Sequence, residues 1–175
     1  MALLSLQTGL RAGEIFSLKG HDLDFENGLI SITDPKNKTA RKAYMTGAVE
    51  EMLKRRMPDN PPDFVFKDRT HGGRINIISQ TYRKTVETLG LNKGTTDPRQ
   101  RVTFHTLRHT FGSWLAIQGT PILTISQLLG HKTLAMTQRY SHLSPDHKKE
   151  AALNLERMFN QKVNGRQGKK GKGAV

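Results

Sequence analysis

Only one part of the chain alternates apolar and polar residues as a half-buried strand does. This scarcity of strand-like segments is the feature that most restricts the possible fold classes. Residues 28–33 alternate and are rich in β-branched side chains, 34–39 (DPKNKT) have the composition of a turn, and 40–45 are expected to return as a second strand. Residues 64–66 form one further candidate edge strand. Most other apolar residues recur at helical spacing. The sequence therefore predicts a mainly α fold with a small antiparallel β-sheet (α+β).

Helices are expected between breaks made by glycine, proline and short polar residues. The predicted segments are 1–18 with a break at Thr8 and Gly9, 47–57, 75–89, 106–118, 121–129, 134–140 and 145–160. Gly130 stands where a left-handed glycine would end a helix. Residues 161–175 are rich in glycine and lysine and are predicted to be a basic, disordered tail. The 175 residues are thus expected to form one domain, 1–160, followed by this tail.

The charge of the chain points to a polyanionic partner. Lys and Arg number 28 against 15 Asp and Glu, which gives a formal net charge of +13, and the tail contributes +5 of it, so +8 lies on residues 1–160. A basic domain is typical of proteins that bind nucleic acid, although a soluble protein with a solvated basic surface has the same charge. The lack of cysteine excludes disulfides and cysteine-based metal sites. No apolar run is long enough to span a membrane, and no secretory signal is visible.

Four polar clusters follow one another along the chain, and each is ordinary when taken alone. They are TGLRAGE at 8–14, Lys36 in the predicted turn, HTLRH at 105–109, and LLGH at 128–131 followed nine positions later by Tyr140. A lysine in a turn is usually solvated, and a tyrosine near a helix end is usually packing. On the helix expected at 106–118, helical spacing separates two faces. One face carries His105, Arg108, His109 and Gly112, and the other carries Leu107, Phe111, Trp114 and Leu115.

Taken in order, these clusters resemble the tyrosine recombinases, the phage-integrase family of site-specific recombinases. The resemblance extends from about Leu3 to Leu155, and its most specific part is HTLRH with LLGH and the following tyrosine. It implies a mainly helical catalytic domain that grips double-stranded DNA and cuts and rejoins it by transesterification. The family reaction uses neither a metal nor a nucleotide cofactor, so none is expected here.

The resemblance also implies roles for single residues. Tyr140 would be the nucleophile that forms a 3′-phosphotyrosyl bond, and His105 would take its proton. Arg11 and Arg108 would bind the non-bridging phosphate oxygens, because a planar guanidinium binds phosphate through two points. His131 would donate a further hydrogen bond to the same phosphate.

The leaving 5′ oxygen needs a proton, and the resemblance gives this role to Lys36. Lys38, two positions later, is the competing candidate. Lys36 keeps the family's spacing to the end of the next strand, where Tyr44 stands in place of the usual proline.

Positioning on DNA is expected to come from basic residues outside the clusters. The candidates for contacts with the DNA backbone are Lys19, Lys42, Arg69, Arg74, Arg83, Lys84, Arg99 and Arg101. Helix 145–160 ends in an apolar set, Leu153, Leu155, Met158 and Phe159. The resemblance implies that this helix docks on a neighbouring copy in a homotetramer on DNA, with packing on its own domain as the alternative.

Members of the family usually carry a separate core-binding domain before the arginine cluster. Only ten residues precede Arg11, so the chain is expected to lack that domain and the first catalytic helices, as a truncated or partial product. We therefore expect the chain alone to bind DNA weakly. The expected location is the cytoplasm, in association with the nucleoid, for a protein of bacterial or phage origin.

Three other interpretations account for part of the sequence. Residues 122–140 have the pattern of a helix–turn–helix, which would make the chain a DNA-binding module without catalysis. A type IB-like topoisomerase shares the tyrosine chemistry but relaxes DNA. A zinc site formed by His109, His142 and His147 has no carboxylate at ligand spacing to support it, so no metal site is predicted.

Overall fold

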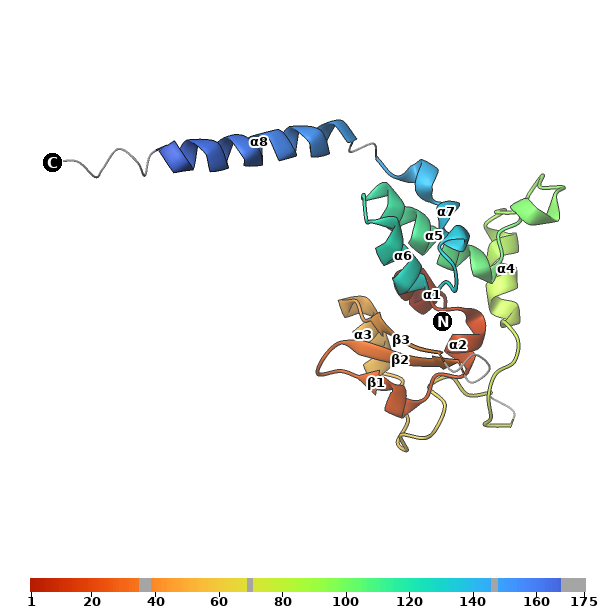
Figure 1. Ribbon diagram of the computed structural model, residues 1–175. Coiled ribbons are helices and arrows are strands. Elements are labelled where there is room, and N and C mark those ends of the chain that lie inside the picture. Colours follow the sequence, from red (N-terminus) through yellow and green to blue (C-terminus); the bar gives the residue numbers. More distant parts are fainter. Residues whose placement is uncertain (35–38, 69–70, 146–147, 168–175) are drawn as a thin grey trace.

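The computed structural model describes residues 1–34, 39–68, 71–145 and 148–167 (Figure 1). Lys36, Lys38, Arg69 and His147, which were candidates above, lie outside the described residues, as does the chain from 168 onward. No helix in the described ranges combines the length and the apolar character needed to cross a bilayer.

The N-terminal segment forms two short helices with the predicted break between them. Helix α1 (Ala2–Thr8) ends at Gly9, whose left-handed φ of 69° lets the chain turn. Helix α2 (Ala12–Phe16) follows at once and leads into the 3-10 turn η1 (Gly20–Asp22).

The β-sheet has three strands in the order β1-β2-β3, and both pairings are antiparallel. They are β1 (Leu23–Asp24), β2 (Leu29–Asp34) and β3 (Thr39–Tyr44), with Ile30 opposite Ala43. The predicted hairpin is therefore confirmed. The predicted edge strand at 64–66 is wrong, because Phe64 makes only an isolated bridge to Lys19.

The remaining helices follow the predicted order, with different ends. They are α3 (Gly47–Lys54), α4 (Gln80–Thr88), α5 (Phe104–Ile117), α6 (Ile122–Leu129), α7 (Ala135–Gln138) and α8 (Lys148–Gln167), with 3-10 turns η2 (Pro98–Gln100) and η3 (Ser141–Leu143). Helix α4 begins later than predicted because the Ser79 hydroxyl caps it, accepting from the Tyr82 N–H. Helix α8 ends at Gln167, later than the predicted end at 160.

Two apolar cores hold the body together. The larger core joins α1, α2 and α3 to the sheet around buried residues such as Leu4, Ile15 and Ile30. The smaller core lies between α5 and α6 and contains Ala116, Ile125, Leu129 and Tyr140. In Figure 1, the sheet and α3 form one end of the body, α5 to α7 form the other, and α1 lies between them.

Helix α5 is buried on a different side from the one expected. Trp114 was assigned to its apolar face, but 53% of its surface is exposed, while Arg108, Gly112 and Ala116 are buried. The reason lies in the partners of these three residues. The guanidinium of Arg108 is hydrogen-bonded on both sides, and the Tyr140 ring fills the space above Gly112.

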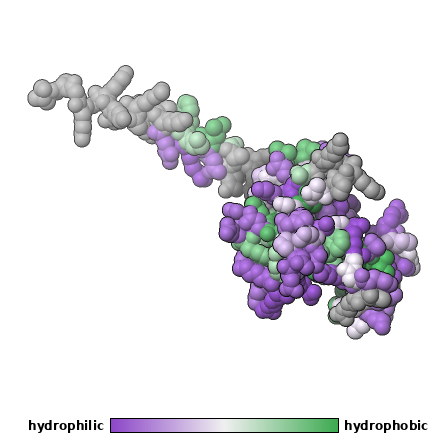
Figure 2. All heavy atoms as spheres, turned by 90° about the horizontal axis from the view of Figure 1, so that it is seen from below, coloured by the Kyte–Doolittle hydropathy of each residue, from purple (hydrophilic) through white to green (hydrophobic). Residues whose placement is uncertain are grey.

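Helix α8 projects from the body (Figure 1). All of its apolar residues named above are more than 40% exposed, and Leu155 reaches 69%. Figure 2 shows apolar side chains along one edge of this helix and hydrophilic ones along the other. In this structure α8 does not pack on its own domain, so its apolar edge is uncovered.

Candidate active site

Arg108 is the most enclosed charged side chain in the part of the chain that the structure describes, with 2% of its surface exposed. Its guanidinium donates hydrogen bonds to the carbonyls of Gly9 and Leu129, at the ends of α1 and α6. Helix ends of this kind carry partial negative charge, which stabilises a buried cation. Burial, together with the charge of Arg11, lowers the pKa of Arg108 to about 10. Arg108 therefore stays charged at neutral pH, and three of its five N–H donors remain for a ligand.

Arg11, Glu14, Arg41 and Arg108 form a group that we call the arginine cluster. The Glu14 carboxylate accepts from the Arg11 backbone N–H at 2.7 Å and from the Arg11 guanidinium at 3.1 Å. It also pairs with Arg41 of β3 at 2.8 Å. The side chain of Arg41 is only 15% exposed, and its second terminal nitrogen, Nη1, is buried without a hydrogen-bond partner. One carboxylate thus holds two arginines, and the cluster keeps an excess of positive charge.

The turn after α6 is enclosed by this cluster. Arg108 donates to the Leu129 carbonyl, and Arg11 donates to the Gly130 carbonyl at 3.4 Å. Gly130 has a left-handed φ of 61°, and a Cβ placed on it would lie 2.3 Å from Nε of Arg41. Only glycine fits there without displacing Arg41. The turn therefore fixes all three arginines relative to one another and to the next residue, His131.

His131 is oriented from the interior. Its Nδ1 lies 2.7 Å from the hydroxyl of Thr137, which is fully buried, and its backbone N–H donates to Ser126. Burial first, and then Arg108 and Arg11, lower the pKa of His131 to about 4. His131 is thus neutral at pH 7, and the Thr137 bond leaves its Nε2 free to face a ligand.

His105 and His109 lie one turn apart on α5, with ring centroids 4.5 Å apart and the rings almost perpendicular. Burial and the charges of Arg108 and Arg11 lower the pKa of His105 below its ordinary value. Burial and the neighbouring His105 lower the pKa of His109 to about 4. Both rings are neutral at pH 7 and able to accept a hydrogen.

Tyr140 is almost fully enclosed, with 4% of its surface exposed. Its ring packs in the smaller core over Gly112, and its hydroxyl lies 2.8 Å from Nδ1 of His109. Burial raises the pKa of the phenol above 10, which Arg139 and Arg108 partly offset. The structure thus brings the Tyr140 hydroxyl next to His109. His105, which the family resemblance implies as the base, lies one helical turn away from His109 on α5.

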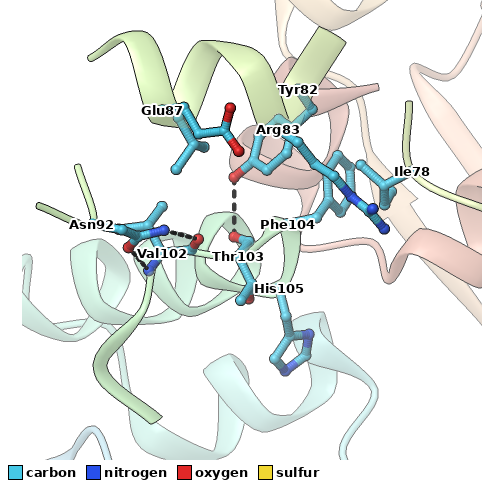
Figure 3. A pocket seen from close by; sticks show the side chains of 10 residues that line it. Ile78, Tyr82, Arg83, Glu87, Asn92, Val102, Thr103, Phe104 and His105 are labelled. Atoms are coloured by element: carbon cyan, nitrogen blue, oxygen red, sulfur yellow. Dashed lines mark hydrogen bonds between the residues drawn. The ribbon is translucent and has the colours of Figure 1, made fainter. Parts of the chain in front are cut away.

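A cavity of about 470 Å³ adjoins His105 (Figure 3). It lies between α4 and the segment before α5, and hydrogen bonds from two side chains fix that segment. The Tyr82 hydroxyl donates to the Thr103 carbonyl at 3.0 Å, and the Asn92 amide bonds both backbone groups of Val102. These contacts hold the first turn of α5 and thereby the position of His105.

The predicted DNA-backbone contacts occupy varied surroundings. Lys42, Arg74, Arg83, Lys84, Arg99 and Arg101 are exposed, whereas Lys19 is half-buried with its ammonium 5.4 Å from the centre of the Phe64 ring. Arg99 forms an ion pair with Asp97 at 3.1 Å. Arg83 lines the cavity beside His105, which places one of these cations next to the candidate site.

Sequence reasoning missed Arg41 and Thr137 and gave no role to Glu14. Arg41 could have been found from strand alternation, because it shares the face of β3 that carries the buried Ala43. Thr137 lies in a helix of only four residues, too short to show a pattern. That length also weakens the helix–turn–helix interpretation, because the second helix would have to enter a DNA groove.

Among the described residues, no group of three or more His, Asp or Glu side chains is arranged to hold a metal ion. Of the proposed zinc ligands, His109 instead contacts Tyr140.

Comparison with known proteins extends over most of the chain. The model of the phage integrase family matches residues 1–147. Tyrosine recombinase XerA of Pyrococcus furiosus is 30% identical over 155 residues, which cover 86% of this chain and 52% of the relative. The catalytic domain of bacteriophage HP1 integrase has 25% identity and a TM-score of 0.65, covering 91% of this chain and 82% of that one. XerH recombinase bound to its difH substrate has 25% identity and a TM-score of 0.63, covering 86% and 44%.

The mainly helical fold with its three-stranded sheet is that of the catalytic domains of site-specific DNA recombinases. With its family model matched over residues 1–147, the chain belongs to the phage integrase family. It spans about half the length of the relatives that it matches.

Proposed function

We propose that this chain is the catalytic part of a site-specific DNA recombinase, which cuts and rejoins DNA through a 3′-phosphotyrosyl bond to Tyr140. One observation carries the proposal: Arg11 and Arg108 both anchor on the Leu129–Gly130 turn, directly before His131 and beside the small core that holds Tyr140. Cations fixed in this way can stabilise the negative charge that spreads over a phosphoryl group during transfer.

In the proposed reaction, a phosphodiester binds against Arg11, Arg108 and His131. The oxygen of Tyr140 attacks phosphorus, its proton passes to His105, and the bond from phosphorus to the 5′ oxygen breaks. Lys36, or Lys38 in its place, gives a proton to the leaving oxygen. The energy of the broken ester is kept in the phosphotyrosyl bond, so rejoining requires no ATP. No step calls on a metal ion.

Double-stranded DNA is the proposed partner, supported by the net charge of +13 and by the similarity to a recombinase solved on its DNA substrate. The exposed cations named above would contact the backbone and contribute salt dependence, at roughly 0.9 in log–log slope for each phosphate neutralised. A DNA-acting enzyme of this type, whether of bacterial or phage origin, would work in the cytoplasm in association with the nucleoid.

The uncovered apolar edge of α8 supports the proposal of a homotetramer on DNA. Each copy would place its α8 on the next copy, a head-to-tail contact that closes into a ring when four copies meet. Changing Leu155 and Phe159 to Asp is expected to prevent the assembly of synapses on DNA while leaving binding of a single site intact. Analytical ultracentrifugation with a duplex would measure both states, and an unchanged tetramer would contradict the proposal.

The test of the chemistry uses a nicked suicide DNA substrate, which traps the covalent intermediate. The chain is expected to form a protein–DNA adduct that survives denaturation, and Tyr140→Phe is expected to abolish it while leaving DNA binding nearly unchanged. EDTA is expected to have no effect. An adduct that persists in Tyr140→Phe would remove Tyr140 from the mechanism, and strong inhibition by EDTA would point to a metal.

A further inference from the structure

The hydroxyl of Tyr140 has one hydrogen-bond partner among the described residues, and that partner has no role in the mechanism above. It is Nδ1 of His109, at 2.8 Å. The ring itself packs against apolar groups and Gly112. We assign the hydroxyl as the donor and Nδ1 as the acceptor, which corresponds to the neutral His109 tautomer that carries its hydrogen on Nε2.

The arrangement follows from the spacing of residues on α5. Positions 105, 109, 112 and 116 fall on one face of the helix, as a histidine, a histidine, a glycine and an alanine. The two small residues leave room for the Tyr140 ring, and a Cβ on Gly112 would lie 2.8 Å from its Cζ. The ring is thus laid along α5 with its oxygen directed at His109, toward the end of the helix where His105 begins.

The charges around this contact favour a shared hydrogen over a transferred proton. The groups that face His109 are His105, Arg108 and Arg139, and with burial they lower its pKa to about 4. Burial raises the pKa of the Tyr140 phenol. An acceptor this weak does not deprotonate such a phenol, so both groups stay neutral and the contact orients the hydroxyl.

We propose that His109 is a positioning residue for the nucleophile, which accepts the Tyr140 hydrogen at Nδ1 and holds the phenol oxygen one helical turn from His105. This inference rests on the proposed function. In the transfer itself, the bond from Tyr140 to phosphorus forms and the bond to the 5′ oxygen breaks. The phenol proton is released from its hydrogen bond to His109 and passes to His105, the base of the proposed mechanism. His109 is unchanged at the end of the step.

The first test observes the contact without DNA. The chain has three tyrosines, Tyr44, Tyr82 and Tyr140, so labelling with ¹³Cζ-tyrosine gives three NMR signals, and the one lost in Tyr140→Phe is that of Tyr140. His109→Ala is expected to shift the Tyr140 signal and leave the other two in place. Replacing the exposed His71 by Ala is the matched control and is expected to shift none. An unmoved Tyr140 signal in His109→Ala overturns the proposal.

The second test measures the rate of adduct formation on the suicide substrate. His109→Ala is expected to slow it roughly tenfold, the usual effect of losing one orienting hydrogen bond. His109→Asn is expected to restore most of the rate, because its amide oxygen lies near the position of Nδ1, whereas the longer His109→Gln is expected to restore less. A rate in His109→Ala equal to or above that of the parent chain, or no rescue by Asn, contradicts the proposal.

The two tests separate this inference from the proposed function. If Tyr140→Phe still forms the adduct, the proposed function fails whatever the NMR signals show. If Tyr140→Phe abolishes the adduct while His109→Ala changes neither rate nor signal, only the role of His109 is lost. Melting temperatures of all variants show that the chain remains folded.

Discussion

The arginine cluster and the tyrosine side of the site, which consists of His109, Gly112, Leu129 and Tyr140, are held in place by different forces. The arginines are fixed by an ion pair and by carbonyls at two helix ends. Tyr140 is fixed by packing and one hydrogen bond. Polar bonds are directional and set the position of each arginine, whereas the Tyr140 ring is placed by the shape of the space around it. The site therefore has a polar half, the arginine cluster, and a packed half, the tyrosine side.

The largest effect on the polar half is expected from Arg108→Met, which keeps the bulk and removes the charge. The carbonyls of Gly9 and Leu129 would lose their donor inside the protein. We expect the free energy of unfolding to fall by about 2–5 kcal/mol and adduct formation to fall at least 100-fold. Urea unfolding and the suicide substrate measure the two effects. Stability equal to that of the parent chain would show that these bonds do not hold the site.

Gly112→Ala tests the packed half. The added methyl would meet the Tyr140 ring and a methyl group of Leu129, while alanine is better than glycine in a helix by about 1 kcal/mol. The opposing terms are expected to leave stability within about 2 kcal/mol of the parent, whereas displacement of the ring lowers adduct formation roughly tenfold or more. Gly47→Ala is the control, since nothing lies within 4 Å of its added Cβ. Equal rates for both variants would argue against a close fit at Gly112.

A smaller effect is expected from Arg41, the member of the arginine cluster that lies on β3. Arg41→Met removes one partner of Glu14 and leaves Arg11 paired. We expect a loss of about 1–2 kcal/mol in unfolding free energy and a several-fold slower adduct, because Glu14, which positions Arg11, then has one partner fewer. Combining it with Glu14→Gln in a double-mutant cycle measures the coupling. Strict additivity of the two changes would show that Arg41 does not act through Glu14.

The smallest expected effect is that of pH. The pKa values of His109 and His131 are about 4 in the folded chain, against an ordinary value of 6.5. Between pH 6.5 and 4 the unfolded chain therefore binds protons that the folded chain does not, so stability is complete above pH 6.5 and declines as the pH falls through this range. Because both rings are partly exposed, we expect the melting temperature to drop by only about 2–5 °C from pH 7.5 to pH 5. A higher melting temperature at pH 5 would contradict these pKa directions.

Much of the fold was predictable because local chemistry determines it. The hairpin follows from alternation, and the ends of α1 and α6 follow from Gly9 and Gly130. The resemblance of the ordered clusters to the tyrosine recombinases pointed to Arg108, His131 and Tyr140 without a structure. Helix α7 spans Ala135–Gln138 and was predicted over 134–140, because a helix this short shows no apolar pattern that distinguishes it from the adjoining turns.

The partners of the candidate residues were not predictable, since they depend on contacts between distant segments. Arg41 reaches Glu14 from 27 positions away, and Arg108 reaches Gly9 from 99. His109 was visible as part of HTLRH, but its contact with Tyr140 depends on how the start of η3 packs on α5. The enclosure of the Tyr140 ring likewise follows from Gly112 and Leu129 meeting in space, which no periodicity encodes.

Several of these contacts between distant segments meet at Gly130. Its backbone turns the chain, its carbonyl receives Arg11, and its missing side chain is the space that Arg41 occupies. A library that randomises position 130 and selects for adduct formation should consequently return glycine. Making room by a change at Arg41 would not suffice for another residue, because the left-handed φ of 61° also disfavours a side chain there.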